Sequence, residues 1–186
     1  MTSSQHSLIR PRLATVWLGG CSGCHMSFLD LDDRLIDLAS IAEIVYSPLV
    51  DTKTFPANVD VTLVEGAVAN VDHWELIHRV RENSRTVVSF GDCAVNGNVT
   101  AMRNPQGDPI DLLRECYHRG DPPNSTLPLD PPIVPPLLRR VLPVHQVVPV
   151  DYFLPGCPPD AALIYDVTLG LLTGHPIDLA GRFRFG

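Results

Sequence analysis

Short β-rich apolar runs alternate with helical patterns along this chain, and this alternation restricts the possible folds more than any other feature of the sequence. Runs typical of strands occupy residues 13–19 (LATVWLG), 43–46, 59–68 (VDVTLVEGAV), 86–90 (TVVSF) and 147–154 (VVPVDYFL). Apolar residues at helical spacing occupy residues 27–41, 71–80, 109–119 and 161–174. Strands that alternate with helices in this way fold into an open, mainly parallel sheet with helices on both faces. The predicted fold class is therefore α/β and doubly wound.

The chain has room for one well-filled core, because 186 residues rarely divide into two domains. We expect a flexible N-terminal arm over residues 1–12 and a single domain over residues 13–186. Residues 121–136 (DPPNSTLPLDPPIVPP) hold seven of the 18 prolines, which predicts an extended crossing over the surface. This crossing is either a plain connector or a docking segment for a partner.

Charge and hydropathy exclude several classes of partner. The formal net charge is −7 and no block of Lys or Arg forms a stripe, which argues against nucleic acid and against an anionic membrane. No segment approaches the roughly 20 apolar residues that cross a bilayer, and the first 17 residues contain no export signal. We therefore expect a cytoplasmic protein. In that reducing compartment, five cysteines indicate metal binding or catalysis rather than disulfides.

Four of the five cysteines directly follow predicted strands. Cys21 and Cys24 (CSGC) follow residues 13–19, Cys93 (GDC) follows residues 86–90, and Cys157 (GCPP) follows residues 147–154. The carboxyl ends of parallel strands lie at one edge of a sheet, where ligands bind, so the four thiols are predicted to form one site. Cys116 lies inside a predicted helix instead, and we interpret it as a small packed residue.

Three kinds of site could use these thiols. A [4Fe–4S] cluster takes four cysteines, and the glycines beside each cysteine let backbone amides approach such a negatively charged group. A structural zinc site usually takes two close pairs in a small domain, whereas Cys93 and Cys157 are single and far apart in sequence. A thioredoxin-like dithiol would use Cys21 and Cys24 alone and leave the other two unexplained. The pattern favours the cluster, with zinc and the dithiol as alternatives.

Two further polar residues lie close to these cysteines. His25 follows Cys24 directly and is either a local hydrogen-bonding group or a donor that modulates a cluster. Glu65, in the strand-end sequence VEG, is either a hydrogen-bonded group or a possible proton relay. We find no Ser/His/Asp set and no phosphate-binding loop, and hence no catalytic residue proper in this chain.

The order CSGC, VEG, GDC and GCPP resembles the small subunit of nickel–iron hydrogenases and, more distantly, the 20-kDa subunit of respiratory complex I. The spacing of Cys21 and Cys24 is that of the hydrogenases. The resemblance implies a flavodoxin-like fold and assigns Cys21, Cys24, Cys93 and Cys157 as the ligands of one [4Fe–4S] cluster. Glu65 corresponds to the glutamate of the family's VEG stretch.

Among such subunits this chain looks like the short form found in soluble, cytoplasmic, NAD-reducing hydrogenases, because it has no twin-arginine leader and ends 29 residues after Cys157. The resemblance then implies a large nickel–iron subunit, where hydrogen is split, and diaphorase subunits that carry flavin and further iron–sulfur clusters. The flavodoxin-like fold also admits a flavin mononucleotide (FMN), but GGCSGCH occupies the loop that would hold its phosphate. A relay subunit of a complex I-like or formate-linked oxidoreductase is the alternative function.

Overall fold

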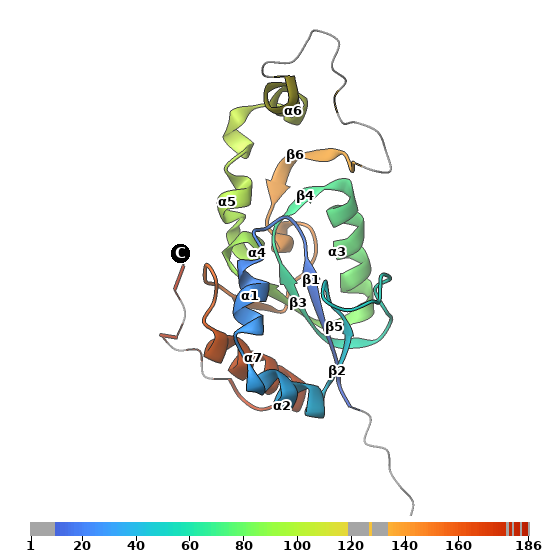
Figure 1. Cartoon of the computed structure of the whole chain (residues 1–186), viewed down its shortest axis with the longest axis vertical. Coiled ribbons are helices and arrows are strands. Elements are labelled where there is room, and N and C mark those ends of the chain that lie inside the picture. The colour runs from blue at the N-terminus through green and yellow to red at the C-terminus, as the bar shows by residue number, and fades with distance from the viewer. Residues whose placement is uncertain are drawn as a thin grey trace, which may run out of the picture.

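The computed structural model describes residues 10–118, 127, 134–177, 179, 181–182 and 184–185. Its main sheet has five parallel strands in the order β2-β1-β3-β5-β7 (Figure 1). These strands are β1 (Arg12–Trp17), β2 (Glu43–Tyr46), β3 (Val59–Glu65), β5 (Ser84–Phe90) and β7 (Tyr152–Leu154). The order matches the 2-1-3-4-5 arrangement of flavodoxin-like sheets, so the predicted fold class is confirmed.

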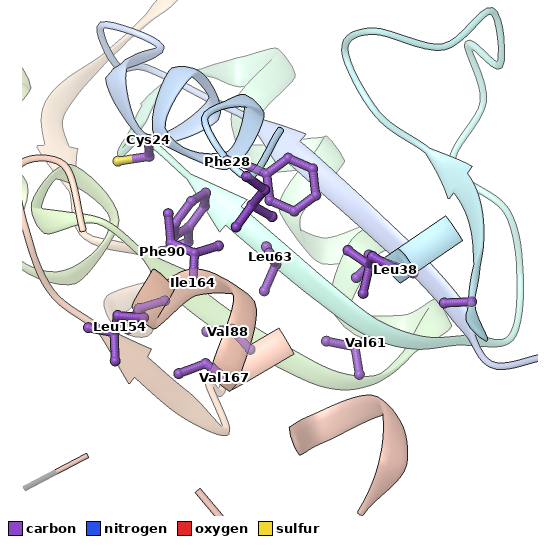
Figure 2. Close-up of a cluster of buried hydrophobic side chains, with 14 residues drawn as sticks. Cys24, Phe28, Leu38, Val61, Leu63, Val88, Phe90, Leu154, Ile164 and Val167 are labelled. Atoms are coloured by element: carbon purple, nitrogen blue, oxygen red, sulfur yellow. The ribbon is translucent and has the colours of Figure 1, made fainter. Parts of the chain in front are cut away.

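Helices cover both faces of this sheet, as Figure 1 shows. One face packs against α1 (Gly23–Leu29), α2 (Asp33–Ile41) and α7 (Ala161–Thr173), and the other packs mainly against α3 (Val71–Asn83). On the first face Phe28, Leu63, Phe90 and Ile164 form one buried cluster (Figure 2). Each such side chain contributes about 1.5–3 kcal/mol when it is fully buried. The two apolar faces explain why the strands read as nearly continuous apolar runs.

The carboxyl ends of four strands are level with one another. Trp17 pairs with Glu65, Glu65 with Phe90, and Phe90 with Leu154. Each strand thus reaches the same row before its chain turns into a loop. This row is the edge from which all four predicted ligands depart.

A second, two-stranded antiparallel sheet was not predicted. It pairs β4 (Val68–Asn70) with β6 (Leu137–Leu142). The strand predicted over residues 59–68 ends three residues early, at Glu65, because the chain breaks at Gly66. This glycine has φ +86°, and a Cβ on it would lie 2.9 Å from the backbone of Gly19. Only a glycine fits so close an approach.

Two other boundaries differ from the predictions. The single helix predicted over residues 27–41 is two helices, α1, which begins earlier at Gly23, and α2. They are separate because the chain turns over residues 30–32 and Asp32 takes φ +51°. Of residues 147–154, only the last three form a strand, and Val144–Gln146 (η2) forms a single helical turn before them. The remaining elements are α4 (Asp92–Asn96), α5 (Asn98–Ala101), η1 (Asn104–Gln106) and α6 (Pro109–His118).

Most of the predicted arm over residues 1–12 and of the proline-rich crossing over residues 121–136 lies outside the described residues. Among the helices that are described, none is both long and apolar enough to cross a membrane.

Candidate functional site

All four predicted ligands lie just beyond the level row of strand ends. Cys21 and Cys24 follow β1, Cys93 lies on α4 after β5, and Cys157 follows β7. Cys24 and Cys93 are buried, each 7% exposed, whereas Cys21 and Cys157 are exposed. The site therefore has an inner and an outer half.

Cys116 lies apart from this edge, on α6, as its position in the sequence indicated. Its predicted packing was wrong, however, because the side chain is exposed. Ile110, Leu113 and Tyr117 of the same helix line a groove against β6, and Cys116 is not among the residues of that groove.

The buried thiol of Cys24 is close enough to the other three cysteines to interact with them electrostatically. Its pKa is raised far above the ordinary range of a thiol, first by burial and then by the negative charges of Glu65, Cys93, Cys21 and Cys157. Burial and these negative charges disfavour the thiolate form of Cys24. Because thiolates are the form that binds metal, loading the site would release protons and relieve this repulsion.

Gly91 lies directly against the side chain of Cys24. It has φ +82°, and a Cβ at this position would lie 2.1 Å from Cys24 Sγ, which is a severe overlap. At the neighbouring ligand Cys21, the backbone N–H of Gly23 donates to Sγ at 3.4 Å. Amide donors of this kind stabilise the thiolate form and tune iron–sulfur sites. These features leave space and N–H donors around the sulfurs.

Asp92 links the loop of Cys93 to the loop of Cys157. The Gly156 N–H donates to Asp92 Oδ1 at 2.7 Å, and the Asp92 N–H donates to Gly156 O at 2.9 Å. The neighbouring Gly91 N–H donates to Leu154 O at 2.8 Å. The Asp92 side chain is buried, at 1% exposure of the residue. Asp92 was not among the predicted site residues, although its place directly before Cys93 was a signal that could have found it.

Ser27 links the same Cys157 loop to the other side of the site. Its hydroxyl donates to Pro159 O at 2.6 Å, across 132 residues of sequence. Ser27 is on α1, one turn after Cys24, so this bond connects the Cys24 helix to the loop that carries Cys157. Nothing in the local sequence marked Ser27, because its partner is distant in the chain.

Glu65 lies at the end of β3 and contacts the helix that carries Cys24. The backbone N–H of His25 donates to Glu65 Oε2 at 2.9 Å, and the ring Nδ1 of His25 contacts the same oxygen. Both residues are buried, with Glu65 only 1% exposed. Among the described residues, His25 Nε2 is buried without a hydrogen-bond partner. The carboxylate thus holds α1 against the sheet, while its role in a proton route stays a prediction.

The donor set of this edge fits an iron–sulfur cluster. Within the described residues, no group of three or more His, Cys, Asp or Glu side chains is arranged to hold a single metal ion. In a cubane each iron takes one protein thiolate, so the four cysteines need not converge on one point. Cys21, Cys24, Cys93 and Cys157 would be those four ligands.

Comparison with a protein-family model matches residues 21–171 to the family described as "NADH ubiquinone oxidoreductase, 20 Kd subunit". The chain belongs to this family. The matched segment contains all four candidate ligands and ends within α7.

Family members among curated proteins include hydrogenase subunits. The chain is 40% identical over 172 residues to the NAD-reducing hydrogenase HoxS subunit delta of Cupriavidus necator, in an alignment that covers 90% of this chain and 81% of that relative. It is 37% identical over 172 residues to a subunit of the F420-non-reducing hydrogenase of Methanothermobacter thermautotrophicus. That alignment covers 90% of this chain but only 55% of the relative. The resemblance to hydrogenase small subunits is therefore confirmed.

Solved structures give the same relationship. A crystal structure of an NAD+-reducing [NiFe]-hydrogenase in its H2-reduced state contains a chain that matches with a TM-score of 0.89 and 40% identity, over 95% of this chain and 99% of that one. The [NiFeSe] hydrogenase of Desulfomicrobium baculatum matches with a TM-score of 0.53 at 16% identity, over 93% of this chain and 68% of that one, which shows a shared fold alone.

Proposed function

We propose that this chain is the electron-transfer small subunit of a cytoplasmic, NAD-reducing nickel–iron hydrogenase. In this role it passes electrons from the nickel–iron site of a large subunit through one [4Fe–4S] cluster to diaphorase subunits. The observation that carries the proposal is that four cysteines follow three strand ends at one edge of a sheet. The chain is also 40% identical to a NAD-reducing hydrogenase subunit, in an alignment that covers 90% of its length.

The cluster, when bound, supplies transfer of one electron at a time. The chain's own residues supply its place and surroundings. Cys24 and Cys93 would hold it from the buried side, and Cys21 and Cys157 from the exposed side. Glu65 and Asp92 fix the loops that carry these ligands, through hydrogen bonds to the backbone N–H groups of His25 and Gly156.

The surface beside Cys21 supports the assignment of a large partner subunit. Trp17, Met26, Val99 and Met102 all expose large apolar side chains. The last two belong to or directly follow α5, whose Thr100 hydroxyl donates to Gly19 O at 3.0 Å, so this apolar surface adjoins the CSGC loop. Exposed apolar side chains grouped around a functional site are typical of a protein interface. The partner that provides the nickel–iron site would cover them.

Two other functions are alternatives to this proposal. The family takes its description from the 20 Kd subunit of NADH ubiquinone oxidoreductase. A relay subunit of another multi-subunit oxidoreductase, complex I-like or formate-linked, is therefore the second candidate. A structural zinc module is the third.

Purification of the native complex under anaerobic conditions tests the proposal. We expect nickel, iron and sulfide in the complex, together with hydrogen-dependent reduction of NAD. A complex that contains iron and sulfide but no nickel would support the second candidate. Zinc in place of iron would support the third, and either result would overturn the hydrogenase proposal.

A pair of cysteine variants tests the ligand assignment itself. Cys157→Ser should lose iron or change the EPR signal of the reduced cluster, because one thiolate ligand is removed. Cys116→Ser is the matched control, an exposed cysteine on α6 that should keep the iron content of the wild type. Equal loss of iron from both variants would contradict the grouping of the four cysteines.

A further inference from the structure

We propose that Asp92 is a positioning residue that sets the place of the fourth ligand, Cys157, by binding the backbone of Gly156. The proposal rests on the cluster assigned above. It adds a role for a side chain that binds no metal itself and that the motifs in the sequence did not reveal.

The geometry of the two loops carries this inference. Gly156, directly before Cys157, is bound to Asp92 in both directions, through its N–H to Oδ1 at 2.7 Å and through its carbonyl to the Asp92 N–H at 2.9 Å. Asp92 is itself directly before Cys93. The two single-cysteine ligands are 64 residues apart in sequence, yet each directly follows one of the two residues that this pair of hydrogen bonds joins.

The local sequence leaves the Cys157 loop few backbone N–H donors. In residues 155–159 (PGCPP), three of the five residues are prolines and have no N–H to donate. Gly156 and Cys157 are the two that do, and the Gly156 N–H is taken by Asp92. Gly156 also has φ +142°, and a Cβ there would lie 2.6 Å from Pro159 Cα, so the loop is tightly folded at this residue.

Burial makes the contact strong. Asp92 is 1% exposed and Gly156 is buried, so an unpaired amide or carboxylate at this place could not form a hydrogen bond with solvent instead. We therefore expect the Cys157 loop to be held in position by Asp92 before any cluster is inserted.

Hydrogen exchange, read by mass spectrometry on the anaerobically purified full chain in its complex, tests the contact directly. Peptic peptides that span residues 150–160 receive only two exchangeable amides from the PGCPP segment, those of Gly156 and Cys157. In the wild type we expect one of these to exchange at least about tenfold more slowly than an open amide. Fast exchange of both would overturn the proposal, even if every variant below failed to fold.

Three variants separate positioning from general stability. Asp92→Ala removes the acceptor and should release the protected amide. Asp92→Asn keeps a side-chain oxygen at the same place and should restore most of the protection. Asp160→Ala is the local control, because this side chain caps α7 through the N–H groups of Ala162 and Leu163 and is three residues beyond Cys157. Protection that is unchanged in Asp92→Ala, or lost equally in Asp160→Ala, would contradict the proposal.

A spectroscopic signature completes the test. A [4Fe–4S]2+ cluster treated with ferricyanide gives up one electron to the oxidant and one Fe2+ to solution, which leaves [3Fe–4S]+. This should happen faster in Asp92→Ala than in the wild type, with an EPR signal of the three-iron form and the loss of about one iron atom per complex. An oxidation rate equal to that of the wild type would overturn the positioning role. A wild type without any iron would instead refute the proposed function.

Discussion

The two ends of the main sheet are held together in different ways. At the carboxyl end, the polar contacts are buried and join side chains to the backbone of distant loops, as in Glu65 with His25 and Asp92 with Gly156. At the amino end, the main ion pair joins Arg81 to Asp151 and is partly exposed. Buried polar contacts must be satisfied completely, whereas exposed ones are screened by water and contribute little. These carboxyl-end contacts and the Arg81–Asp151 pair thus differ in how far they are buried.

The amino end illustrates the weaker kind of contact. Asp151 accepts hydrogen bonds from Arg81 Nη1 at 2.6 Å and from the Val87 N–H at 2.7 Å. Partial burial alone would raise the pKa of this carboxyl, but the bonds from Arg81 and Val87 outweigh it, and the pKa is lowered. These bonds join β5 to the chain just before β7, at the edge of the sheet.

The largest expected effect on the free energy of unfolding is at Gly91, which contacts Cys24. Gly91→Ala should lower the free energy of unfolding by about 3 kcal/mol or more, because the residue has φ +82° and its new Cβ would overlap Cys24 Sγ. Urea denaturation and iron content measure the change. Gly174→Ala is the matched control, with φ +72° and no atom within 4 Å of an added Cβ. It should cost about 1–2 kcal/mol from backbone strain alone. Equal costs would mean that contact with Cys24 does not matter.

A smaller effect is expected at the buried carboxylate. Glu65→Ala leaves the His25 N–H without its acceptor in a buried place, which should cost about 1–3 kcal/mol of unfolding free energy. Glu65→Gln keeps an acceptor oxygen and should cost less. If Glu65→Ala unfolds at the same urea concentration as the wild type, then the carboxyl end does not depend on buried polar contacts as we describe.

The smallest effect is expected at the amino end, in Asp151→Asn. Because the side chain is 42% exposed, its ion pair is screened, and the loss at neutral pH should stay below about 1 kcal/mol. The native pKa lies below the ordinary value near 3.8, so the carboxylate stabilises the fold above that value. This stabilisation is lost as the pH falls through the native pKa. The free energies of unfolding of the variant and the wild type should therefore converge under acid. A difference between them that grows below pH 3.8 would contradict this prediction.

The sequence could predict which strands the four cysteines follow, because this depends on local pattern and on one rule of sheet topology, although β1 and β3 end two and three residues before the predicted ends. It could not predict β6, whose run LLRRVL follows prolines and contains two arginines. It also could not show where α1 stops, because the turn over residues 30–32 interrupts an otherwise regular apolar spacing. The contacts of Asp92 and Ser27 were hidden for a different reason, since their partners are 64 and 132 residues away.

The level row of Trp17, Glu65, Phe90 and Leu154 also limits how the length of this chain can vary. One residue added to or removed from a strand would shift the loop beyond it by about 3.3 Å and turn the strand's buried side chains to the opposite face. Insertions and deletions in relatives should therefore be confined to segments outside these strands. Cys93 and Cys157 each lie only three residues beyond the ends of β5 and β7, so the spacing in these two segments should be preserved as well.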